Sequence, residues 1–152
     1  MPSKVEDIYD QIVTICSSTL PAFKRLPNPY ELTENTFLRL ENGFGVSVGP
    51  GVNENRFVGC FTTWERSFLI TLVKKVSTSQ NNLDLRQTIE KDILVAQDLV
   101  QKAFYANHTL SGNAVTSTVS DDSGINFIDG DRLKFLGLEI NILVKYQEII
   151  TS

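Results

Sequence analysis

Cysteine and histidine are scarce in this sequence, which holds two cysteines and one histidine among 152 residues. Structural zinc sites use closely spaced pairs of such ligands, and Cys16, Cys60 and His108 stand far apart, so the sequence predicts no zinc site. Each cysteine falls in an apolar phase of a predicted element. We therefore expect two buried thiols rather than a disulfide, in a reducing compartment.

Basic charge and long apolar runs are also lacking. The formal net charge is -4, whereas a protein that neutralises nucleic-acid phosphates needs a basic surface. No apolar run approaches the ~18 residues of a bilayer span, and the first ten residues, MPSKVEDIYD, are charged where a signal peptide is apolar. We expect neither a membrane-embedded protein nor one secreted through a signal peptide.

The strongest strand pattern in the sequence is the stretch 57–76, FVGCFTTWERSFLITLVKKV. Its even positions are apolar at Val58, Cys60, Trp64, Phe68, Ile70, Leu72 and Val76, which predicts a strand. At ~3.3 Å per residue, twenty residues of strand would outrun a domain whose radius of gyration is about 15 Å, so part of the ribbon must bend, bulge or project.

Two amphipathic helices are predicted on either side of this strand. The first spans residues 4–20, with Ser3 and Glu6 as a capping box and Pro21 at its end. The second runs for about twenty residues from Asp84, which can form a cap with Gln87, and has an apolar face at helical spacing. Its other face is polar, which is typical of a solvated surface and could also set register between the subunits of a ring.

Turn signals divide the rest of the chain. Asn42-Gly43 predicts a type I′ hairpin that places Arg39 opposite Val46 and Phe37 opposite Val48. Further segments are a surface connector over 21–30, a flexible tip over 49–56, an edge strand over 114–119, acidic turns at 121–124 and 129–131, and a half-buried strand over 136–147. This order predicts an α+β fold over a single domain, 1–152, with a mixed, mostly antiparallel sheet and two helices packed on one face.

No catalytic or cofactor site is predicted. His108 has no nucleophile or orienting acid nearby in the sequence, and the glycines near position 50 lack the Gly-Lys-Ser/Thr of a phosphate loop. Four carboxylates, Asp121, Asp122, Asp129 and Asp131, could hold calcium or serve as a glycosidase pair, but they lack an EF-hand series and fit ordinary turns. We therefore expect a protein that is not an enzyme and binds no metal.

Trp64 and Arg66 share one face of the long strand and are residue types that often anchor interfaces. The alternative is that Trp64 is core and Arg66 snorkels from a sheet margin. The candidate interface consists of Trp64 and Arg66 together with residues of the predicted hairpin, the flexible tip and the second helix. Its members are Arg39, Phe44, Val52, Asn53, Arg56, Trp64, Arg66 and Arg86.

The chain resembles the tail terminator proteins of long-tailed bacteriophages. The residues that carry the resemblance are VEDIYDQIVTIC, CFTTWERSFLITLV, LRQTIEKDILVAQDLVQKAF, GINFIDG and LKFLGLEINILVKYQ. The resemblance implies a virion subunit, made in the host cytoplasm, that assembles as a homo-oligomeric ring, a hexamer, on the tail tube. It also implies that the ring ends polymerisation of the tail-tube protein, joins a head-completion or connector protein, and lets genomic DNA pass without sequence-specific binding.

Related classes of protein remain open as alternatives. Neck, head-completion and minor tail proteins share small α+β subunits with the terminators. A small ligand-binding domain or an enzyme is the more distant possibility.

Overall fold

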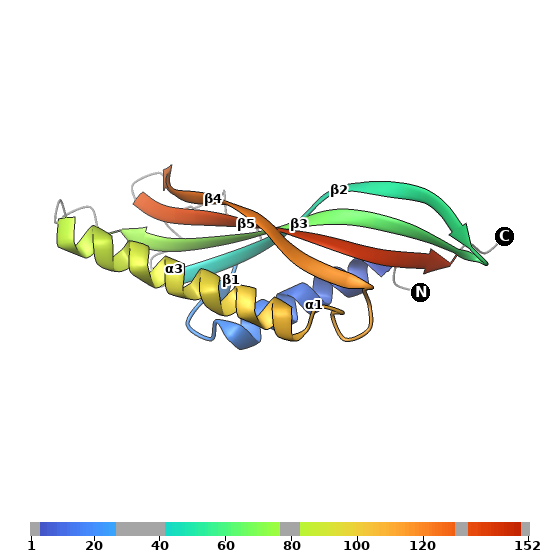
Figure 1. Ribbon diagram of the computed structural model, residues 1–152. Helices are drawn as coiled ribbons and strands as arrows, with labels where there is room; N and C mark the ends of the chain where they lie inside the picture. The colour runs from blue at the N-terminus through green and yellow to red at the C-terminus, as the bar shows by residue number, and fades with distance from the viewer. Residues whose placement is uncertain (1–3, 27–41, 77–82, 130–133, 150–152) are drawn as a thin grey trace.

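The structure is a computed structural model that describes residues 4–26, 42–76, 83–129 and 134–149, apart from the side chains of 55–58, 83–86, 128, 129 and 134. Two helices, α1 (Lys4–Thr19) and α3 (Leu83–Ala106), lie on the same side of a five-stranded sheet (Figure 1). Its strands are β1 (Lys24–Arg25), β2 (Asn42–Val58), β3 (Phe61–Val76), β4 (Thr116–Asp129) and β5 (Lys134–Ile149). The sheet order is β1-β2-β3-β5-β4, with only the β1–β2 pair parallel. The predicted fold class is confirmed.

Strand β3 is the centre of the sheet. It pairs with β5 from Phe61 opposite Ile149 to Val76 opposite Lys134, and with β2 on its other side. The strand predicted over 57–76 is interrupted, because β2 ends at Val58 and β3 begins at Phe61 after a turn. The register of β2 also shifts between Val48 and Gly51 and again between Asn53 and Phe57. The chain turns from β2 into β3 at Gly59, whose φ of 64° is a left-handed value that glycine adopts without strain.

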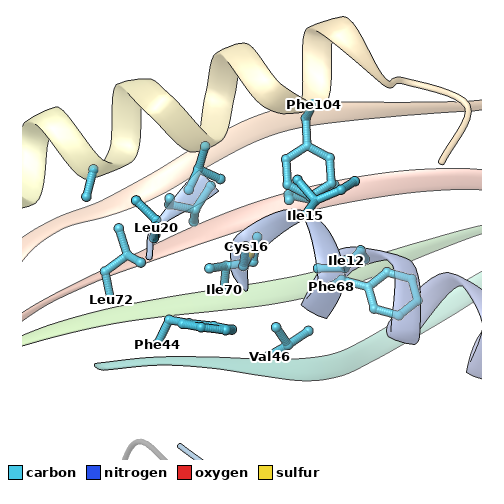
Figure 2. Packing of buried hydrophobic residues seen from close by; sticks show 14 of the residues in the cluster. Ile12, Ile15, Cys16, Leu20, Phe44, Val46, Phe68, Ile70, Leu72 and Phe104 are labelled. Atoms are coloured by element: carbon cyan, nitrogen blue, oxygen red, sulfur yellow. The ribbon is translucent and has the colours of Figure 1, made fainter. Parts of the chain in front are cut away.

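The main core lies between the sheet and the two helices. Ile12, Ile15 and Cys16 of α1 belong to this core with Leu20, which follows the helix, and Phe104 joins them from α3 (Figure 2). On β5 the alternation from Leu136 to Tyr146 places every second side chain in this core at 1% exposure or less. The helical and strand periodicities predicted for α1, α3 and β5 are therefore confirmed.

A second, smaller buried group lies on the opposite face of the sheet. Leu26, Val73 and Phe135 are buried but do not belong to the main cluster. Gly43 pairs with Val73, and a Cβ built on Gly43 would overlap the side chain of Leu26. Leu26 also donates its amide to the carbonyl of Phe44 at 2.8 Å, so the residue after β1 holds this face together.

Three predictions for the first half of the chain are wrong. Asn42-Gly43 begins β2 instead of forming a hairpin turn. The predicted partners Arg39 and Phe37 lie outside the described residues. Val46 pairs with Ile70 instead, and Val48 pairs with Phe68. The segment 49–56 is part of β2 and not a loop. Cys60 is exposed beside Gly59 in the turn, whereas Cys16 is buried as expected, and both are free thiols.

The acidic segment Asp121 to Gly124 is a bulge within β4 rather than a turn. The β4–β5 register shifts between Val119 and Asp121 and between Asp122 and Ile125, and Gly124 has φ 71°. Because β4 continues to Asp129, it is longer than the predicted strand, but it is the sheet edge as expected. The second predicted turn falls mostly on residues 130 and 131, which lie outside the described residues.

Candidate interaction surface

Arg66 joins three strands at the outer end of the main core. Its Nε donates to the hydroxyl of Tyr146 on β5 at 3.2 Å, and its Nη1 donates to the carbonyl of Gly49 on β2 at 3.1 Å. The guanidinium lies 5.8 Å from the ring centroid of Trp64, within cation–π range. A Cβ on Gly51 would come within 2.7 Å of the guanidinium carbon, so this glycine makes room for the arginine.

These contacts fix the β2–β3 hairpin where β2 changes register. The Gly49 carbonyl lies in the irregular stretch between Val48 and Gly51, and Arg66 supplies it with a donor. Trp64 is partly buried and packs against the main core. Trp64 and Arg66 therefore contribute to the rigidity of the hairpin, whatever they contact outside the subunit.

Beyond Arg66, three exposed apolar side chains lie on the part of the sheet that leads to the hairpin turn. Val52 is 67% exposed, Phe61 38% and Ile149 62%. Phe61 stands directly opposite Ile149, and Val52 stands opposite Glu65, which places all three on the face of the sheet away from the helices. We call Val52, Phe61 and Ile149 the distal patch. In Figure 1 this end of the sheet extends past the end of α1.

Polar contacts link the strands on both faces of this end of the sheet, and one of them lies on the same face as the distal patch. Lys145 of β5 forms an ion pair of 3.0 Å with Glu54 of β2. On the other face, Thr62 of β3 donates to the side-chain oxygen of Asn53 at 3.1 Å. These cross-strand contacts order the distal patch before any partner binds.

The structure does not bring all the candidate interface residues together. Val52, Asn53, Trp64 and Arg66 lie along the distal half of the hairpin, whereas Phe44 is 1% exposed in the main core and is therefore part of the subunit's own packing. Arg56 lies in β2, close to the hairpin turn. Arg86 lies in the first turn of α3, and this helix begins at the opposite end of the molecule from the hairpin turn (Figure 1). The side chains of Arg56 and Arg86, and all of Arg39, are outside the described residues.

Sequence reasoning missed Phe61 and Ile149. Phe61 occupies the odd, more polar phase of the strand predicted over 57–76, and Ile149 lies beyond the strand predicted over 136–147. The signal for Phe61 was an apolar residue in a mainly polar phase. The proximity of the two residues depends on a pairing between positions 88 residues apart.

The surface of the described part of the chain has two hollows, one on each face of the sheet. One, of about 400 Å³, is mostly apolar and is lined by Val5, Glu6, Tyr9, Asp10 and Val48, between the start of α1 and β2. The other, of about 300 Å³, lies on the opposite face and is lined by residues of β2, β3, β4 and β5 that include Asp121, Asp122 and Glu139.

Asp121 and Asp122 of the second hollow accept hydrogen bonds from nearby groups of the same chain. Asp122 accepts hydrogen bonds from Gln97 of α3 at 2.7 Å and from the amide of Gly124 at 2.8 Å, and Asp121 accepts one from Ser120 at 2.6 Å. Within the described part of the chain, no group of three or more His, Cys, Asp or Glu side chains could hold a metal ion. His108 is exposed in the turn after α3.

Neither helix, over the described residues, combines the length and apolarity that crossing a membrane requires. Compared with models of protein families and with curated proteins, the chain shows no match.

Proposed function

We propose that this chain is a structural subunit that caps the tail tube of a long-tailed bacteriophage as a ring, ends tube polymerisation and forms the joining surface for the head connector. The observation that carries the proposal is the distal patch, an exposed apolar surface on a hairpin that is held in place by Arg66. The phage setting rests on the resemblance of the sequence to tail terminator proteins.

The geometry supports adhesion. Exposed apolar side chains favour contact with a partner, because burying apolar surface stabilises a complex by about 25 cal/mol per Å². The distal patch lies on paired strands, so its backbone is already ordered and loses little conformational freedom on binding, and more of the gain from burial remains as affinity. A surface of this kind fits a protein partner such as the last ring of the tail tube.

The charge of the chain is consistent with a conduit for DNA. Its net charge is -4, and a surface of like sign repels phosphates and leaves the passing genome unbound. In this proposal the ring is a virion component that contacts tail-tube protein on one side and a head-completion or connector protein on the other.

The test is electron microscopy of tails assembled with and without this protein. We expect tails made without it to vary in length and to remain unattached to heads, and we expect added protein to cap purified tubes at one end. Tails of normal, fixed length that join heads in its absence would refute the terminator role. Normal tube length with a failure of head attachment alone would instead identify a neck or head-completion protein.

A further inference from the structure

The hollow of about 400 Å³ beside α1 is lined by both apolar and acidic side chains. Val5, Tyr9 and Val48 form its apolar part, and the carboxylates of Glu6 and Asp10 line it as well. Tyr9 is fixed in place because its hydroxyl donates to the Val46 carbonyl at 3.3 Å and accepts from Arg25 at 3.0 Å. We call this hollow the α1 groove.

A complementary surface lies on the outer side of α3. Val95 and Leu99 are 59% and 43% exposed, although Ile93, Ala96 and Val100 on the inner side are buried. Lys91 is four residues before Val95, and Lys102 is three residues after Leu99, so the four side chains share one face of the helix. We call Lys91, Val95, Leu99 and Lys102 the α3 stripe.

We propose that the α3 stripe of one copy of this chain binds the α1 groove of the next copy. Val95 and Leu99 then contact the apolar part of the groove, and Lys91 meets the carboxylate of Asp10. This is the helix-in-groove mode, in which residues at i and i+4 anchor an amphipathic helix in an apolar hollow. The inference rests on the proposed function, because it names the contact between neighbouring subunits of the ring.

The two surfaces are different, which determines the kind of assembly. Every copy carries one groove and one stripe on separate helices, so the contact is heterologous and repeats from copy to copy until a ring closes. Charge supports the choice of a second copy as occupant: the groove is lined by two carboxylates with Arg25 at Tyr9, and the stripe has two ammonium groups with Asp98 on the same face. Lys102 already pairs with Asp98 at 2.8 Å, so Lys91 is the residue to test.

The size of the contact predicts how assembly depends on concentration. Stable interfaces bury about 800 Å² on each partner, and one helical stripe in one groove covers only part of such an area. A single contact is then weak, and association becomes strong only where each subunit uses both surfaces in a closed ring.

The experiment is a charge-swap cycle read by analytical ultracentrifugation over a concentration series. We expect Asp10→Lys and Lys91→Glu each to weaken self-association about tenfold, because each places like charges across the contact. The double variant should recover most of the loss. Lys24→Glu and Asp121→Lys are matched controls, since both are exposed and lie outside the groove and the stripe; they should associate like the unmodified chain.

A second variant tests the apolar part of the contact. Val95→Ser with Leu99→Ser removes only exposed side chains, so circular dichroism should show an unchanged fold while self-association falls at least tenfold. Self-association that is unaffected by these variants overturns the groove contact, and so does a chain that stays monomeric at every concentration. Loss of tube capping in the Asp10→Lys variant with intact self-association would assign the groove to another partner and also overturn it. The tail-length assay decides the proposed function separately.

Discussion

At the scale of single residues, Arg66 is the side chain on which the shape of the hairpin depends. It donates to Gly49 and Tyr146 and lies against Trp64. We predict that Arg66→Ala lowers the free energy of unfolding by about 1–3 kcal/mol, because two hydrogen bonds from a charged donor are lost and the Tyr146 hydroxyl and the Gly49 carbonyl are left without this donor. Urea unfolding followed by circular dichroism measures the change.

Tyr146→Phe is the matched control for this prediction. It removes the hydroxyl but keeps the ring, which is 1% exposed, and it leaves the bond from Arg66 to Gly49 intact. We expect a smaller loss, about 1 kcal/mol. If Arg66→Ala unfolded at the same urea concentration as the unmodified protein, Arg66 would not hold the hairpin.

Cys16 gives the protein a defined dependence on alkaline pH. Burial raises the pKa of its thiol from the ordinary value of 9.0 to about 12. An unfolded chain therefore loses this proton near pH 9, while the folded chain keeps it up to about pH 12. The folded state binds more protons in this window, so stability is unaffected by the group below pH 9 and falls as pH rises toward 12, by about 1.4 kcal/mol at pH 10.

The measurement compares urea unfolding of the unmodified protein and Cys16→Ala at pH 8 and pH 10. The variant should be less stable at pH 8, because it leaves a small cavity, but it should lose less stability between the two pH values. Tyrosine and lysine titration affects both proteins alike. Equal losses in the two proteins would contradict a buried, protonated thiol.

At the scale of elements, the sequence predicted those strands and helices whose apolar period repeats without interruption. α1, α3 and β5 were found because one face of each is buried along its length. β2 was missed because its glycines and Pro50 indicate turns when they are considered locally. In the structure Gly43, Gly49 and Gly51 are not turn residues; a Cβ on each would collide with Leu26, Ser67 or Arg66, respectively.

Gly43 tests this explanation of β2. We predict that Gly43→Ala costs about 1–3 kcal/mol of unfolding free energy, since the new methyl group overlaps the side chain of Leu26 and forces it away from the sheet. Thermal unfolding of the variant measures the cost.

A double-mutant cycle with Leu26→Ala separates overlap from backbone effects. In the Leu26→Ala background the Gly43→Ala substitution should cost much less, because the overlapping side chain is gone. An equal cost in both backgrounds would show that Gly43 is needed for another reason.

At the scale of the whole molecule, the sequence located part of the candidate surface and left the rest hidden. Trp64, Arg66 and Val52 were selected for residue type and position in the chain, and they do fall on one half of the hairpin. Phe61 and Ile149 stand opposite each other only because β3 pairs with β5, and Val52 shares their face because β2 pairs with the other side of β3. Such pairing joins positions far apart in sequence, and no local pattern specifies which exposed residues it brings together.

The distal patch gives the last prediction, which concerns what the assembled chain binds. We expect the triple variant Val52→Ser, Phe61→Ser and Ile149→Ser to lose capping of purified tail tubes, with an apparent affinity at least about tenfold lower, because the apolar area available for burial is reduced. Co-sedimentation with tubes and electron microscopy of their ends provide the readout. The side chains are exposed in the subunit, so its unfolding midpoint should change little.

Tyr105→Ser is the control, since Tyr105 is also a large exposed side chain but lies on α3, away from the hairpin. It should cap tubes normally. The triple variant should still self-associate, because the α1 groove and the α3 stripe are unchanged. If it instead capped tubes like the unmodified protein, the hairpin end would not be the surface that meets the tube, and the observation that carries the proposed function would be lost.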